Sequence, residues 1–134
     1  MLTSSTIKRY EKYSVAELKK KCQVVFNSWI RFRDKDKGCI SCPSMEVSHC
    51  SHYLSQGHHS LLRYDEFNSN GSCVRCNLFL HGNLIGYRKG LIKRYGEVKV
   101  LELEGMPKSA YKWDRFTLID KIEDYKTRLK ESKN

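Results

Sequence analysis

Apolar residues recur every three or four positions in the first third of the chain. Leu18, Cys22 and Trp29 belong to this stripe, which predicts an amphipathic helix with Cys22 as a small core residue. Ser14 and Glu17 precede the stripe at capping-box spacing, in which each side chain bonds the other's backbone N–H. We therefore expect a helix over residues 14–35, after a flexible lead-in over residues 1–13.

Two further apolar stripes predict helices in the second half of the chain. The first contains Leu84, Tyr87, Leu91 and Tyr95, and Gly96 then supplies a C-terminal stop. We expect this helix to begin at residue 73 and to be interrupted at Gly82. The second stripe follows a cap predicted at residues 117–120, and we expect its helix to pack on this chain or on a second copy. Its apolar positions are Leu118, Ile122, Tyr125 and Leu129.

Shorter patterns lie between these helices. Residues 45–70 predict two short strands around a turn at Gln56 and Gly57, with the second strand over residues 61–64. Residues 97–104 alternate well enough for another strand. The expected fold class is α+β, in a single domain over residues 1–134. Its parts are the lead-in, the helix over 14–35, a core over 38–96 and a C-terminal extension with a helix over 97–134.

The charge of the chain suggests its partner. Lys and Arg number 25 against 15 Asp and Glu, which gives a formal net charge of +10. A surplus of this size favours binding to nucleic acid or to another anionic surface, through attraction and counterion release. No apolar run is long enough to span a membrane, and the first 30 residues lack a signal-peptide core. We therefore expect a cytoplasmic protein.

Four of the six cysteines form two Cys-x-x-Cys pairs. In a reducing compartment such pairs are metal ligands more often than disulfides. Four thiolates close a tetrahedral zinc site, and because they leave no open position the zinc would be structural. The stretch between the pairs would then be presented as a rigid hairpin. The predicted zinc ligands are Cys39, Cys42, Cys73 and Cys76.

Candidate chemistry lies inside and just after this hairpin. His52 is followed by Asn68, and Asn77 comes directly after the last cysteine. This order resembles that of the HNH nucleases of the ββα-metal group, with Asn at the final position. A side-chain amide oxygen is a suitable ligand for a hard ion such as Mg²⁺.

The resemblance is closer to one branch of that group, the phage recombination nucleases called NinG or Rap. Residues 16–42, AELKKKCQVVFNSWIRFRDKDKGCISC, are similar to the family's first helix and its Cys-Ile-Ser-Cys. The similarity continues in order through residues 52–57, 62–64, 68, 73–77, 82–83 and 87–91, and reaches Lys112-Trp113 and the terminal helix. Departures from the family pattern stand at His49, Cys50, Ser51, Asn70 and His81.

The resemblance implies a zinc-stapled ββα-metal core, treble-clef-like, with flanking N- and C-terminal helices. It also implies a mechanism. His52 would act as general base on a water aligned with the scissile phosphorus, and Asn68 would hold the loop. One catalytic Mg²⁺ or Mn²⁺ would act as Lewis acid, ligated by Asn77 with His49 or Asn83 as helpers. The products would carry 5′-phosphate and 3′-hydroxyl ends.

The substrates implied by the resemblance are branched DNAs, such as Holliday junctions or D-loops of phage recombination in the host cell. Cutting two strands of a four-way junction would suit a two-fold homodimer. We see no base-reading pattern, so recognition of DNA shape is favoured. The candidate phosphate contacts are Arg63, Arg75, Arg88, Lys89, Lys93 and Arg94.

Two rival interpretations stay open. The departures from the family pattern allow a non-catalytic zinc module that binds DNA or a recombination partner. A sequence-specific HNH nuclease would instead cut linear duplex at one site and ignore branching.

Overall fold

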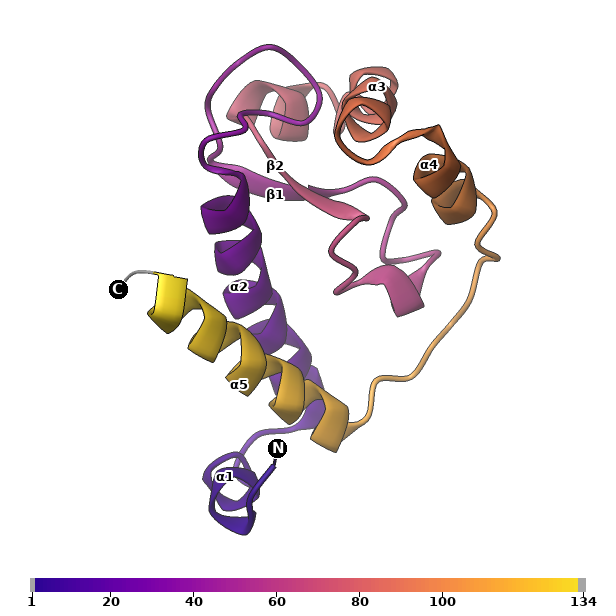
Figure 1. The fold of residues 1–134 in the computed structure, drawn as a ribbon. Coiled ribbons are helices and arrows are strands. Elements are labelled where there is room, and N and C mark those ends of the chain that lie inside the picture. Colours follow the sequence, from indigo (N-terminus) through magenta and orange to yellow (C-terminus); the bar gives the residue numbers. More distant parts are fainter. Residues whose placement is uncertain (1, 133–134) are drawn as a thin grey trace. The chain divides into compact units, whose positions relative to one another are not determined.

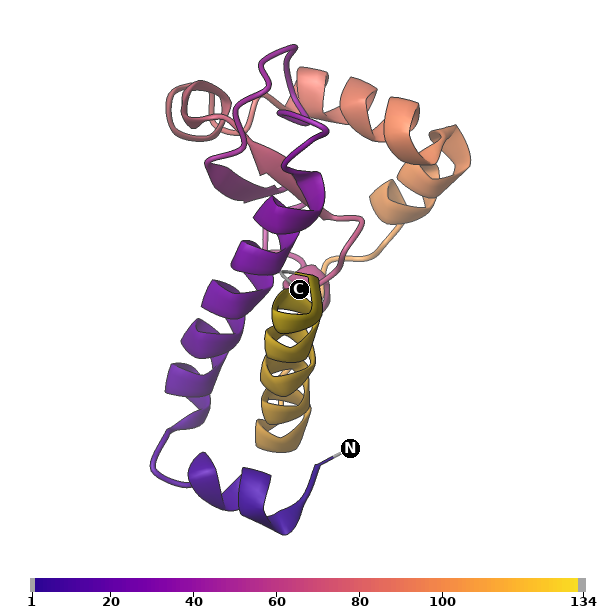
Figure 2. The ribbon, with the colours of Figure 1, turned by 60° about the vertical axis from the view of Figure 1, so that its left-hand side comes forward.

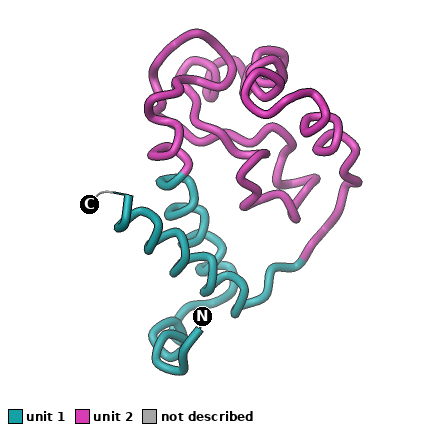
Figure 3. The backbone as a smooth tube through the Cα atoms, viewed as in Figure 1, with its two compact units in different colours: residues 1–29, 112–134 teal, residues 30–111 magenta. Residues whose placement is uncertain are grey.

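The computed structural model describes residues 2–132 and falls into two compact units (Figure 3). Unit 1 comprises residues up to 29 together with those from 112 onward, and unit 2 comprises residues 30–111. The helix α2 (Val15–Asp34) belongs to both, because its last residues lie in unit 2. No helix within residues 2–132 combines the length and the apolar character that crossing a bilayer requires.

Unit 1 is helical, and its core lies between two helices. Helix α5 (Arg115–Ser132) packs beside the unit 1 part of α2 (Figures 1 and 2), where the rings of Phe26 and Tyr125 meet edge to face at 5.0 Å. Leu118 and Ile122 are buried as expected, so the apolar seam of α5 is covered by its own chain. Cys22 is also fully buried.

Helix boundaries in unit 1 confirm one cap and correct two expectations. The capping box is confirmed, with the Ser14 N–H 3.2 Å from Glu17 and the Glu17 N–H 3.1 Å from the Ser14 hydroxyl. The lead-in is not loose, because α1 (Ser4–Arg9) forms there and Thr3 caps it by accepting from the Thr6 N–H. Helix α5 begins before residue 117, since Asp114 accepts the bond from the Thr117 N–H.

Unit 2 contains a two-stranded antiparallel sheet, β1 (His49–His52) and β2 (Ser69–Ser72), in which His52 pairs with Ser69. The sheet confirms the α+β class, but the second strand is not the predicted one. Residues 60–62 form a 3₁₀ turn, η1 (Ser60–Leu62), whereas the strand is the polar segment that follows. Its four residues are all buried and carry no apolar side chain.

Three helical segments complete unit 2. A π-helical turn, η2 (Arg75–Phe79), follows the sheet, and α3 (Leu84–Tyr95) and α4 (Glu97–Glu104) pack together (Figure 2). The interruption near Gly82 and the stop at Gly96, with φ of 89°, are confirmed. The strand expected over residues 97–104 is wrong, because the buried residues Val100 and Leu103 are three positions apart, as on a helix face.

A buried carboxylate joins the end of α2 to β2. Asp34 accepts two bonds from Arg33, at 2.7 and 2.9 Å, and one from the Gly71 N–H at 2.8 Å. Arg33 also donates to the Ser69 carbonyl at 3.0 Å and to the side chain of Asn70 at 3.2 Å. Burial would raise the pKa of Asp34, but these bonds outweigh it and hold the pKa below its ordinary value. Polar bonds therefore replace apolar packing under β2.

Candidate metal centre and hairpin site

The four cysteines of the two Cys-x-x-Cys pairs meet in one cluster. Their sulfur atoms all lie within 4.8 Å of one another, and the Sγ atoms of Cys42 and Cys73 are 3.7 Å apart. Tetrahedral zinc with bonds of about 2.3 Å places its sulfur ligands about 3.8 Å apart. The expected convergence of these cysteines is confirmed, and the cluster can hold a metal such as zinc. Its members are Cys39, Cys42, Cys73 and Cys76.

The surroundings of the cluster suit thiolate ligands. Backbone N–H groups of Ser41 and Cys76 donate to Cys39 and Cys73, both at 3.4 Å, and the Asn83 amide donates to Cys76 at 3.5 Å. Burial raises the pKa of Cys76 to about 12, because a charged thiolate is poorly solvated there. A divalent ion supplies the charge that would allow the sulfurs to ionise together.

Helix α3 locks the first cysteine loop in place through its glycines. A Cβ atom on Gly86 would stand 2.0 Å from the Ser41 carbonyl oxygen, and one on Gly90 would stand 1.9 Å from that of Ile40. Asn83, in the left-handed conformation at φ of 48°, also donates to the Ser41 carbonyl, at 3.1 Å. The close contact between helix and loop therefore depends on two positions without side chains.

One ring nitrogen of His52 forms a hydrogen bond, and the buried ring favours its unprotonated form. Its Nε2 lies 2.8 Å from the carbonyl oxygen of Arg63. A carbonyl only accepts, so Nε2 carries the proton and Nδ1 retains the lone pair. Burial lowers the pKa of His52 and outweighs the opposite effect of the Arg63 carbonyl. The ring is therefore neutral at pH 7.

Asn68 closes the loop that connects the two strands. Its side chain accepts from the Leu54 N–H at 2.8 Å and donates to the Leu54 carbonyl at 3.0 Å. Its own N–H donates to Asp65 at 2.8 Å, and its carbonyl accepts from the Tyr53 N–H at 2.9 Å. Because Tyr53 and Leu54 directly follow His52, these bonds fix the chain on which the imidazole stands.

The three expected ligands of a catalytic ion occupy different places. Asn77 is half-buried on η2, and its N–H donates to the Cys73 carbonyl at 3.1 Å. His49 is three positions before His52 on β1, so the two rings leave the strand on opposite faces. Asn83 donates its amide to the cysteine cluster and to the Ser41 carbonyl, as described above. Among residues 2–132, that cluster is the only group of three or more His, Cys, Asp or Glu side chains arranged to hold a metal.

The six predicted phosphate contacts also lie in different places. Lys89 and Lys93 line a groove of about 650 Å³ along the first cysteine loop, together with Lys37, which the sequence did not single out. Arg94 lines the groove too, but it donates to the Gly38 carbonyl at 2.9 Å. Arg88 is paired with Glu104 at 2.9 Å. The remaining two are Arg63, which stacks on Tyr64 at 5.5 Å, and the exposed Arg75.

Sequence reasoning missed the polar network behind the hairpin. The buried Tyr87 hydroxyl donates to the Ser51 carbonyl at 2.8 Å, and Asn70 donates to that hydroxyl at 3.2 Å. Tyr95 donates to the Asn70 side chain at 3.2 Å. The helical stripe identified both tyrosines as apolar core residues, and their spacing gave no sign that the hydroxyl groups support the strands.

These features define a small α+β protein in which a four-cysteine cluster, of the kind that binds zinc, brackets a histidine-bearing hairpin. The chain matches the family model described as "Bacteriophage Lambda NinG protein" over residues 3–134. It therefore belongs to the NinG family.

Curated relatives agree with this assignment. The chain is 40% identical to Protein ninG of Escherichia phage 933W over 87 residues, which cover 63% of this chain and 43% of the relative. It is 35% identical to that of Salmonella phage P22 over 114 residues (84% and 56%) and 33% identical to that of Escherichia phage lambda over 117 residues (86% and 57%). The chain spans about half the length of the curated relatives it matches. No solved structure matches it.

Proposed function

We propose that this chain is an HNH-type, metal-dependent endonuclease that cuts branched DNA during phage recombination in the host cell. The order of its parts supports the proposal: a cysteine pair, a hairpin with His52, the loop residue Asn68, and a second pair followed by Asn77. In this reading the sheet and η2 form the ββα core, and the cysteine cluster braces it. Family membership and the surplus of positive charge agree with it.

The bond between His52 Nε2 and the Arg63 carbonyl carries the proposal. A general base in phosphodiester hydrolysis must offer a lone pair to water at the working pH. The bond at 2.8 Å leaves that lone pair on Nδ1, and the lowered pKa keeps the ring unprotonated. Asn68 holds the backbone beside His52, so the ring is oriented before substrate arrives.

A hard divalent ion, Mg²⁺ or Mn²⁺, would neutralise charge on the scissile phosphate and its leaving oxygen. Asn77 is the candidate ligand, through its amide oxygen. No carboxylate cluster stands ready for such an ion in residues 2–132, so water and the DNA phosphate would supply its other ligands. Mg²⁺ commonly keeps several waters and binds through one or two protein groups plus phosphates.

The groove beside the first cysteine loop is the proposed DNA contact of unit 2. Lys37, Lys89 and Lys93 line it, and their charges suit backbone phosphates rather than base edges. We expect Arg94 and Arg88 to contribute less, since carbonyl oxygens and Glu104 already engage them. If two copies act together on a four-way junction, their contact lies away from the buried seam of α5.

The test compares two histidines of the same hairpin. Purified protein is incubated with an end-labelled four-way junction, a D-loop and linear duplex, with Mg²⁺ supplied or withheld. We expect Mg²⁺-dependent cuts at the branch, lost in His52→Ala and retained in His58→Ala, because His58 is exposed in the same loop. Chelators are avoided here, since they would also strip the cysteine cluster.

Two alternatives have defined outcomes in the same assay. A non-catalytic zinc-stabilised DNA-binding or accessory module is favoured because residues 2–132 hold no metal-binding group of His, Cys, Asp or Glu besides the cysteine cluster, and because the buried Ser51 precedes His52. It would bind the junction, leave it uncut, and be indifferent to His52→Ala. A sequence-specific nuclease would cut the linear duplex at one site whether or not a branch is present.

A further inference from the structure

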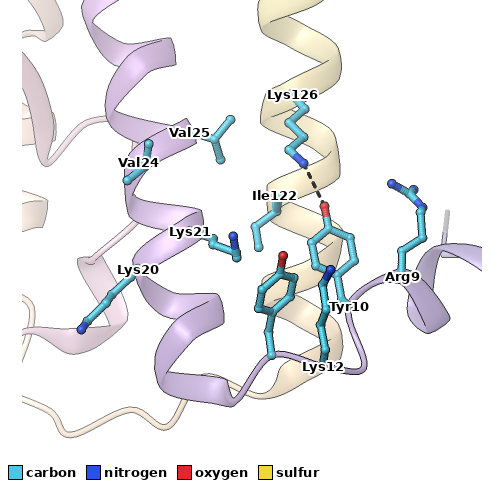
Figure 4. Close-up of a pocket in the computed structure, with 10 residues that line it drawn as sticks. Arg9, Tyr10, Lys12, Lys20, Lys21, Val24, Val25, Ile122 and Lys126 are labelled. Atoms are coloured by element: carbon cyan, nitrogen blue, oxygen red, sulfur yellow. Dashed lines mark hydrogen bonds between the residues drawn. The ribbon is translucent and has the colours of Figure 1, made fainter.

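Unit 1 has a basic pocket that the proposed chemistry does not use (Figure 4). It lies among α2, α5 and the turn over residues 10–13, with a volume of about 550 Å³, within the range of ligand pockets. Half of its ten lining residues are cationic and none is acidic. They are Arg9, Tyr10, Lys12, Tyr13, Lys20, Lys21, Val24, Val25, Ile122 and Lys126.

Three of the pocket's lysines form no ion pair among residues 2–132. Arg9 is paired with Glu123 at 2.6 Å. In contrast, residues 2–132 show no ion pair to Lys12, Lys20 or Lys21. Glu17 interacts electrostatically with Lys20 and Lys21 but forms no ion pair with either, and five cations around one pocket still repel one another. An anionic ligand would relieve that repulsion.

The turn at the pocket's edge is held in place. Arg115 of α5 donates to the Tyr10 carbonyl at 3.1 Å and also to that of Tyr13. The Tyr10 hydroxyl accepts from Lys126 at 3.1 Å, as Figure 4 shows, and donates to Glu123 at 3.0 Å. The pocket wall is thus fixed before any ligand binds, which lowers the entropy lost on binding.

The remaining walls are apolar. Val24 and Val25 project from α2 and Ile122 from α5 toward the same space, and Val24 is 68% exposed (Figure 4). Tyr13 adds a ring whose face Lys21 covers at 4.2 Å. A ligand that matches this pocket carries negative charge on one side and a flat apolar face on the other. An unpaired nucleotide has both, whereas an intact duplex presents phosphates but keeps its base faces stacked inside.

We propose that this pocket binds an unpaired nucleotide of a DNA strand. Lys12, Lys20 and Lys21 contact its backbone phosphates, and the base lies against the wall formed by Val24 and its neighbours. The inference rests on the proposed function in that DNA is the ligand and branched DNA offers unpaired nucleotides. It adds a binding site for single strands to unit 1.

The first test measures binding without cleavage. The 134-residue chain carrying His52→Ala, without added Mg²⁺, is titrated into a fluorescein-labelled 20-nucleotide oligo-dT strand while anisotropy is followed at several salt concentrations. Lys20→Ala with Lys21→Ala should weaken binding about tenfold at 0.1 M salt and reduce the log–log salt slope by about 1.4. The matched control, Lys112→Ala with Lys130→Ala, removes two exposed lysines outside the pocket and should change the slope less.

Two further comparisons separate a site from diffuse attraction. Val24→Glu should weaken binding and Val24→Lys should strengthen it, with thermal midpoints unchanged because the side chain is exposed. A strand with abasic sites should bind several-fold more weakly than oligo-dT. Equal losses in both lysine pairs, or equal affinity for the abasic strand, would overturn the proposal. Because cleavage is absent from these measurements, their outcome is independent of whether His52 is a general base.

Discussion

Burial and one hydrogen bond together set the protonation state of His52, the proposed general base. An imidazole in water titrates near pH 6.5, so roughly a quarter of its molecules would be protonated at pH 7. Burial in the hairpin lowers the pKa, and the Arg63 carbonyl selects the tautomer. The sequence identified this histidine by its place between the cysteine pairs, whereas its state depends on a carbonyl that no pattern revealed.

The pH dependence of cleavage follows from this shift. A general base acts when unprotonated, so the proposed cleavage of the junction should fall with pH at a midpoint below about 6.5. The same shift stabilises the fold: its contribution is fully present above about pH 6.5 and is lost as pH falls through the lowered pKa. Single-turnover rates across pH 5–8.5 would measure the profile. A fall centred above pH 7 would exclude His52 as the base.

Asp34 is the residue whose charge should matter most for stability. Asp34→Asn removes the buried carboxylate that pairs with the half-buried Arg33 and weakens the bond from the Gly71 N–H. Breaking a buried pair in this way costs about 3–5 kcal/mol in the free energy of unfolding. Asp36→Asn is the matched control, because Asp36 is exposed two residues away. Urea unfolding of both variants provides the measurement, and equal midpoints would contradict the role given to Asp34.

Among the elements, α2, α3 and α5 were predictable and β2, α1 and α4 were not. The long helices bury apolar residues at regular spacing, which a pattern reveals. Strand β2 buries Ser, Asn and Gly, whose partners Arg33, Tyr87 and Tyr95 are distant in sequence. The strand was therefore predicted at the apolar Leu61-Leu62, although those residues form a 3₁₀ turn. Hydrogen bonds from residues distant in sequence therefore determine which segment forms the second strand.

Helix α3 depends on a glycine that would ordinarily weaken a helix. Elsewhere in a helix, Gly→Ala raises the free energy of unfolding by up to about 1 kcal/mol. In α3, Gly90→Ala should do the opposite, because its methyl group would lie 1.9 Å from the Ile40 carbonyl oxygen. We expect a lower melting temperature and faster zinc release to a chromophoric chelator. Ile85→Ala, at a position 78% exposed on the same helix, should leave both unchanged. Gly90→Ala with normal zinc retention would show that the loop can move aside.

At the scale of the whole molecule, the division into two units was not foreseen. A single domain over residues 1–134 stays a prediction; within it, residues 112–132 group with the first helices rather than with the segment preceding them. Pairing of distant helices leaves no mark in a hydrophobic stripe, since a stripe shows that a face is buried and not what covers it. The cysteine pairs were predictable, because their spacing and thiol chemistry indicate that the four cysteines meet at one metal.

Removing metal should affect the units unequally. Unit 1 has its own apolar core, whereas the cysteine cluster adds to a smaller apolar cluster in unit 2 around Ile40, Tyr87 and Leu91. After treatment with a zinc chelator, amide protons over residues 39–76 should exchange rapidly, while those of α5 stay protected. Hydrogen–deuterium exchange with mass spectrometry reports both segments in one experiment. Uniform loss of protection would mean that the metal supports the whole chain.

The polar strand β2 also sets an order of events during synthesis. Its backbone partner β1 and the Arg33–Asp34 pair leave the ribosome before it, but Tyr87 and Tyr95, whose hydroxyl groups bond to the same hairpin, emerge later. Strand β2 itself has no apolar side chain, and the buried apolar residues Leu62 and Tyr64 lie in the loop between the two strands. We therefore expect the hairpin to reach its final position only after α3, which carries Tyr87 and Tyr95, has been translated.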